Sequence, residues 1–130
     1  MTDEFPAGIA QFIDQQIESL AQLEAIILLR KDPARYWTSE EIAKALYITP
    51  DMAGLLLAEM ARRGFARVES ETPARFAYGP HDSPTDRLVG ELASLYHDRP
   101  VAVISLIYSK PLNKVQTFAD AFRLRKENQS

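Results

Sequence analysis

The sequence contains no cysteine, and this absence removes several classes of protein at once. Disulfide scaffolds, zinc–thiolate sites and thiol nucleophiles all require that side chain. Only five glycines are present, which leaves little material for a glycine-rich loop that cradles phosphates. The longest apolar run, Val101–Tyr108, is interrupted by Ser105 and is too short to span a membrane. The sequence therefore indicates neither a membrane protein nor a nucleotide-binding enzyme of a common type.

Positive charge is missing from the start of the chain. Residues 1–24 hold acidic side chains but no lysine or arginine, and Met1-Thr2-Asp3-Glu4 lacks the basic region of a signal peptide. We therefore expect a cytoplasmic protein. Over all 130 residues the net charge is −3, with 46% hydrophobic and 25% charged residues. This composition is ordinary for one soluble domain with its own core.

Two helices joined by a short turn are predicted between residues 38 and 63. Thr38-Ser39-Glu40-Glu41 has the form of a capping box, in which Thr38 and Glu41 each accept from the other's backbone N–H. After a turn at Tyr47-Ile48, Thr49 caps the second helix and Pro50 takes its first position, where a missing N–H costs nothing. The second helix has one apolar face at helical spacing, made of Ala53, Leu56, Leu57, Met60 and Ala61.

A β-hairpin is predicted directly after these helices. Gly64 ends the second helix. Phe65–Glu69 alternates as a strand, Glu71–Ala74 turns the chain, and Arg75–Tyr78 alternates back before Gly79-Pro80. A helix-turn-helix followed by a hairpin is the order of elements in a winged-helix domain.

The stretch of about residues 19–80 resembles the winged-helix transcription regulators of bacteria. This family keeps two spaced apolar residues, then a glycine, and an apolar residue directly after the glycine. In this chain those positions are held by Leu57, Met60, Gly64 and Phe65. The resemblance implies a mostly α-helical fold with a small β-hairpin wing, and a regulatory function that operates by binding.

Further helices are predicted on both sides of this domain. Apolar spacing indicates one helix over about 8–18 and another over about 20–30, and Ser83-Pro84 opens a third. Residues 101–109 are rich in β-branched side chains, which suits a strand, but the sequence offers no partner strand outside the wing. We favour a helix that begins at Pro100.

These elements divide the chain into three parts. We expect an N-terminal arm and helix over 1–18, the winged helix-turn-helix over 19–80, and a C-terminal helical extension over 83–130. Within the extension, Phe118 and Phe122 lie one helical turn apart, which predicts a helix over 112–126 with a basic end. It either closes the core or docks on a partner or a second subunit.

The outward face of the second helix of the motif is unusual for a DNA reader. Base readers carry arginine, lysine, asparagine, glutamine, serine or threonine there. Here Leu55 points directly outward, with Asp51, Met52 and Glu59 beside it. The hairpin tip, residues 69–71, is also acidic. These side chains favour a protein partner or a second copy of the chain over DNA.

Three interpretations therefore remain open. In the favoured one, a non-enzymatic regulator with an atypical, non-basic recognition helix forms a homodimer or binds another protein; the candidate contact residues are Met52, Leu55, Glu59, Phe118 and Phe122. In the alternative, a DNA-binding regulator contacts duplex; the candidate residues are Lys44, Arg62, Arg63, Arg67 and Arg75. In the third, the C-terminal segment of the same chain covers Leu55.

Signs of catalysis or metal binding are weak. His81, Asp82 and Asp86 lie close in sequence but lack a ligand spacing typical of a metal site. His97-Asp98 lies near a helix end, where neighbours need not converge on a substrate. We therefore expect no enzyme, no cofactor and no metal.

Overall fold

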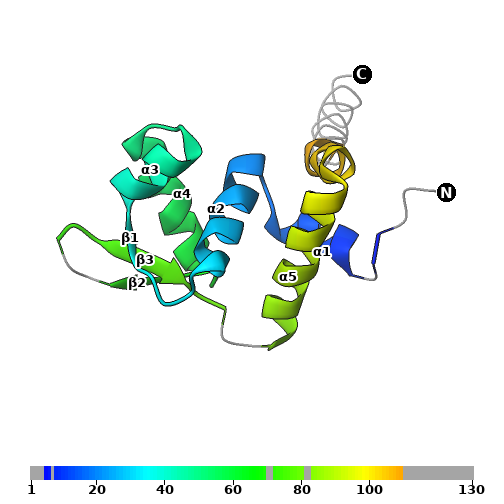
Figure 1. The fold of residues 1–130 in the computed structure, drawn as a ribbon, viewed down its shortest axis with the longest axis horizontal. Helices are drawn as coiled ribbons and strands as arrows, with labels where there is room; N and C mark the ends of the chain where they lie inside the picture. Colours follow the sequence, from blue (N-terminus) through cyan, green and yellow to red (C-terminus); the bar gives the residue numbers. More distant parts are fainter. Residues whose placement is uncertain (1–4, 7, 70–71, 81–82, 110–130) are drawn as a thin grey trace, which may run out of the picture.

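The computed structural model describes residues 5, 6, 8–69, 72–80 and 83–109. Helices dominate this part of the chain (Figure 1). Their bounds are α1 Ile9–Gln16, α2 Leu20–Lys31, α3 Ser39–Leu46, α4 Pro50–Arg62 and α5 Ser83–Asp98, and residues 100–109 are also helical. Residues 101–109 are therefore helical, as favoured above. The predicted helix over 112–126, with Phe118 and Phe122, lies outside the described residues.

The helix-turn-helix forms as the capping residues predict. At α3, Thr38 Oγ1 accepts from the Glu41 backbone N–H at 3.1 Å, and Glu41 Oε1 accepts from the Thr38 N–H at 3.0 Å. At α4, Thr49 Oγ1 accepts from the Met52 N–H at 3.1 Å. Gly64 follows α4 with a φ of +87°, a left-handed conformation that glycine adopts without strain. The local sequence therefore fixes both ends of α4.

A three-stranded antiparallel sheet forms the wing. β2 (Ala66–Glu69) and β3 (Arg75–Tyr78) are the predicted hairpin, with Val68 opposite Phe76. A third strand, β1 (Trp37–Thr38), pairs with β3, so that the strand order is β1-β3-β2. β1 was not predicted from the sequence. A strand of two residues is too short to show an alternating pattern.

The hydrophobic core joins the helix-turn-helix, the sheet and α2. Ile26 and Leu29 of α2, Ile42 of α3, and Leu57 and Met60 of α4 are all buried. Trp37 is also buried. Because Ala53, Leu57 and Met60 point into this core, the opposite side of α4 is directed away from it.

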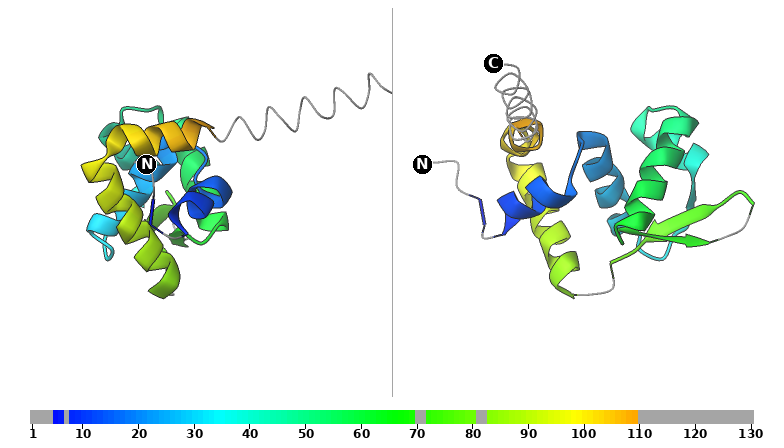
Figure 2. Two further views of the ribbon diagram at one scale, coloured as in Figure 1. Left: turned by 90° about the vertical axis from the view of Figure 1, so that its right-hand side faces the viewer. Right: turned by 180° about the vertical axis from the view of Figure 1, so that it is seen from behind.

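A second group of helices packs at the other end of the molecule. α1, α5 and the helical residues 100–109 lie together, away from the wing, in Figure 1 and in the view from behind (Figure 2). Val89, Leu92, Val103 and Ile107 are buried in the same core cluster. Within the described ranges, no helix has the length and apolar character needed to cross a membrane.

Candidate nucleic-acid interface

The outward face of α4 is uncovered. Leu55 is 72% exposed and Met52 57% exposed, and Asp51 and Ala58 of the same face are exposed as well. Tyr47, in the turn before α4, is 95% exposed and has a φ of +59°. Because Leu55 is this accessible, none of the described residues covers it. The interpretation that the C-terminal segment of the same chain covers Leu55 concerns residues outside the described ones.

A groove separates the first turns of α4 from the wing. It has a volume of about 760 Å³ and lies between α4, the start of α3 and the segment before β3. Its apolar lining includes Leu55, Pro73 and Phe76, and its acidic lining includes Glu40 and Asp51. None of the described residues that line the groove is a lysine or an arginine. The groove thus combines apolar and acidic side chains, as the outward face of α4 does.

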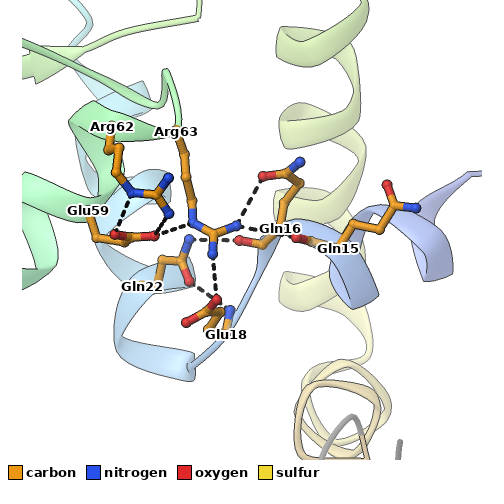
Figure 3. A network of polar contacts seen from close by, with 7 residues as sticks. All are labelled: Gln15, Gln16, Glu18, Gln22, Glu59, Arg62 and Arg63. Carbon is orange, nitrogen blue, oxygen red and sulfur yellow. Dashed lines mark hydrogen bonds and ion pairs between the residues drawn. The ribbon is translucent and has the colours of Figure 1, made fainter. Parts of the chain in front are cut away.

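Arg62 and Arg63, two of the candidate phosphate contacts, have different surroundings at the end of α4 (Figure 3). Arg62 is largely exposed and donates to Glu59 at 3.0 and 2.5 Å. Arg63 has a side chain only 15% exposed. It donates to Glu59 at 2.7 Å and to Glu18 at 2.5 Å, and it reaches the carbonyl of Gln15 at 3.2 Å. Arg63 therefore links α4 to the junction of α1 and α2.

The carboxylate of Glu59 is the centre of this arginine pair. Hydrogen bonds from Arg62, and then from Arg63, lower the pKa of Glu59 from 4.5 to about 2. These hydrogen bonds stabilise the charged carboxylate, and their effect on the pKa outweighs that of burial, which alone would raise it. Glu59 was a candidate partner contact, but its charge is already compensated within the fold.

The junction of α1 and α2 is itself held by a buried amide. Gln22 is 3% exposed and accepts from the Glu18 N–H at 2.7 Å, while its Nε2 donates to the Gln16 carbonyl at 2.8 Å. The Glu18 carboxylate that contacts Arg63 is therefore on a fixed segment. Sequence reasoning did not identify Gln22, because only the folded chain shows that this amide is buried.

The arginines of the sheet also have partners within the fold. Arg67 donates to the Tyr78 carbonyl at 2.9 Å, and Arg75 donates to Glu69 across the hairpin at 2.6 Å. Lys44, at the end of α3, is exposed. Arg35 is exposed too, with its guanidinium carbon 3.5 Å from the Trp37 ring centroid. Lys44 and Arg35 are thus accessible cations on the helix-turn-helix side.

Asp86, once a weak metal candidate, joins the wing to the helices. It accepts from Tyr78 Oη at 2.7 Å and from Arg30 Nε at 3.1 Å. Burial, and then the bond to Asp86, raise the pKa of the Tyr78 hydroxyl. His81 and Asp82 lie outside the described residues. Among the residues that are described, no group of three potential ligands gathers into a metal site.

Comparison with known proteins identifies the fold through structure alone. No family model matches the sequence, and no curated protein is similar to it. MepR, a transcription regulator of the multidrug efflux pump MepA of Staphylococcus aureus, matches with a TM-score of 0.51 and 19% identity, over 92% of this chain and 89% of that chain. A MepR variant bound to an oligodeoxyribonucleotide matches with a TM-score of 0.51 and 19% identity, over 92% and 88%.

A further solved structure, a MarR family transcription regulator, matches with a TM-score of 0.44 and 16% identity, over 95% of this chain and 73% of that chain. The two MepR matches establish that this chain has the winged helix-turn-helix fold of transcription regulators, with helices added at both ends. The resemblance seen in the sequence, and the mostly helical fold with a small wing, are confirmed. The prediction that a protein partner is favoured over DNA rested on the side chains of α4, and these comparisons do not support it.

Proposed function

We propose that the chain is a non-enzymatic transcription regulator that binds duplex DNA with α4 and the wing. The observation that carries this proposal is the open face of α4: its outward side is not covered by any described residue, and it stands beside the wing in a helix-turn-helix whose ends are both capped. In helix-turn-helix proteins the second helix of the motif enters the major groove. The similarity to a MepR variant that was solved with an oligodeoxyribonucleotide supports the same assignment.

Phosphate contacts come from accessible cations around this face. Lys44 and Arg35 are exposed on the helix-turn-helix side, although Arg35 also lies 3.9 Å from the Glu41 carboxylate. Arg75, next to the tip of the wing, is half-buried and already bonded to Glu69. Arg62 is accessible but already pairs with Glu59, and Arg63 is mostly buried. Since each phosphate contact releases counterions, we expect affinity to fall as salt rises, with a modest slope because few of the described cations around this face are exposed.

We further propose that two copies act together. Helix-turn-helix dimers bind two half-sites about one helical turn apart, because a symmetric protein matches a palindromic duplex. Val101 is 75% exposed and Tyr108 is also exposed, both on the helical residues 100–109 at the end away from the wing. A pairing of these ends would leave both α4 helices free. A location in the cytoplasm, as expected from the sequence, is consistent with this function.

Protein binding at the same face is the second candidate. The groove beside α4 combines apolar Leu55, Pro73 and Phe76 with the carboxylates of Glu40 and Asp51. These features suit a peptide segment with apolar and basic side chains. In that case the exposed face would bind no duplex, which makes the two functions separable by experiment.

Selection from random-sequence duplexes at moderate salt tests the proposal. We expect a defined motif to be enriched. Leu55→Glu should then weaken binding on the order of a hundredfold, because it places a carboxylate against the duplex. Gln11→Glu adds the same charge at an exposed position of α1, at the other end of the molecule, and should bind nearly as the parent does. No enrichment, or equal loss in both variants, would contradict the proposal.

A further inference from the structure

The exposed part of α4 has an apolar and acidic character that the proposed function leaves unexplained. Its first two turns present Met52, Leu55 and Ala58 together with Asp51. This part of the face offers no side-chain hydrogen-bond donor. Arg62, which does, lies at the far end of α4 and is held by Glu59.

The major groove contains groups that match such a face. Guanine presents only acceptors, N7 and O6, and adenine presents N7 beside its amino group, so that purines are read best by donors. Thymine presents an apolar C5-methyl group, and cytosine presents an N4 amino donor. Of the four bases, the two pyrimidines fit apolar and carboxylate side chains.

We infer that α4 reads pyrimidines: Leu55 and Met52 pack against thymine methyl groups, and Asp51 accepts from the N4 amino group of a cytosine. This inference rests on the proposed function, since it requires that α4 enter the major groove. It deepens that function by naming the kind of duplex that the chain recognises, a half-site with thymines and a cytosine on one strand.

The spacing of the three side chains suits neighbouring bases. Asp51 and Leu55 are four residues apart on one side of α4, which at about 1.5 Å per residue is roughly 6 Å along the helix axis. Successive bases on one strand are separated by about 3.4 Å. Asp51 and Leu55 would thus meet bases about two steps apart. Met52, next to Leu55 on the same face, is close enough to share the contact with thymine.

Asp51 also supplies discrimination against the wrong base. A carboxylate accepts hydrogen bonds but has none to donate. Opposite guanine it would face O6 and N7, and opposite thymine it would face O4, all of them acceptors. Opposite adenine, the N7 acceptor beside the amino group would face the second carboxylate oxygen. Two acceptors that face each other weaken binding, so Asp51 favours cytosine, whose amino group has no N7 acceptor beside it.

Removal of the thymine methyl groups tests this inference directly. The duplex enriched from random sequences is resynthesised with deoxyuridine in place of individual thymines, which deletes the methyl group and keeps the base pairing. We expect binding to weaken about fourfold for each methyl group that is contacted, as follows from the burial of one carbon. Thymines outside the contact should tolerate the exchange.

Variants assign the effect to the named side chains. In Leu55→Ala the difference in affinity between the thymine and deoxyuridine duplexes should shrink, because one of the two apolar partners is gone. Gln11→Ala shortens an exposed side chain on α1, at the opposite end of the molecule, and should keep the full ratio. Asp51→Asn, whose amide can also donate, should relax the preference for cytosine.

The outcomes separate this inference from the proposed function. Loss of affinity with deoxyuridine that shrinks in Leu55→Ala supports pyrimidine reading. A selected motif that binds equally with thymine and deoxyuridine would overturn the inference and leave DNA binding intact. If no duplex is enriched at all, the proposed function fails and the inference with it.

Discussion

Arg62 and Arg63 are neighbours in sequence, and the fold gives them different roles. Arg62 lies on the solvent side of α4, while Arg63 turns toward α1 and is only 15% exposed. Both were candidate phosphate contacts. A side chain with four internal partners, as Arg63 has, is better suited to hold α4 in place than to bind DNA.

Replacement of Arg63 should therefore cost stability. Arg63→Ala removes hydrogen bonds to the carboxylates of Glu59 and Glu18, and we expect the free energy of unfolding to fall by about 1–3 kcal/mol. Denaturation in urea measures the change. Arg62→Ala is the matched control and should have little effect, because exposed ion pairs contribute little. Equal losses from the two variants would contradict the structural role of Arg63.

The Glu59 carboxylate should make the free energy of unfolding depend on pH in the acid range. Its pKa in the folded chain is about 2, below the ordinary 4.5, so the unfolded chain binds a proton more readily. The contribution of Glu59 to the free energy of unfolding is complete above pH 4.5 and is lost as the pH falls toward 2. Urea unfolding of the parent and of Glu59→Gln across this range should converge at the acid end. Because the group is exposed, the effect should be small and should shrink with added salt.

At the scale of elements, helix caps decide where α3 and α4 begin. Thr49 accepts from the Met52 N–H at the start of the helix that we propose enters DNA. Thr49→Ala should lower the free energy of unfolding by about 1 kcal/mol, and Thr49→Ser should restore most of it, since serine caps a helix equally well. Thermal melts of the three chains give the comparison. A Thr49→Ser melt that matches the Thr49→Ala melt would show that the hydroxyl is not what holds this end.

Local signals predicted most of these elements. Caps, the proline at the start of α4 and Gly64 act within a few residues, so the sequence contains their effect directly. β1 was missed because its two residues become a strand only by pairing with β3. Residues 101–109 were ambiguous because β-branched side chains suit a buried helix as well as a strand, and Val103 and Ile107 pack into the core.

The candidate site was less predictable than the fold. The exposure of Leu55 and Met52 followed from helical spacing, because the opposite face of α4 was clearly apolar. The surroundings of Arg63, the bonds of Arg67 and the groove beside the wing depend on residues distant in sequence. No local pattern records such contacts, and residues on α1 and the sheet decide which arginines remain accessible.

At the scale of the whole molecule, the two ends have different surfaces. The end with α1, α5 and residues 100–109 exposes Val101 and Tyr108. Burial of such surface is favourable at about 25 cal/mol per Å², and we expect the full chain to sediment as a dimer at tens of micromolar. A charged side chain in place of Val101 should shift the equilibrium toward monomer. A parent chain that sediments as a monomer would contradict this prediction.

The central claim is that α4 and the wing form the surface that meets DNA. NMR shifts of the backbone amides, recorded with and without the duplex enriched from random sequences, test it residue by residue. The account predicts that the large changes fall in residues 49–58 and 72–76, with Lys44 nearby, and that α1 changes little. Large changes confined to α5 and residues 100–109, with α4 unaffected, would contradict it.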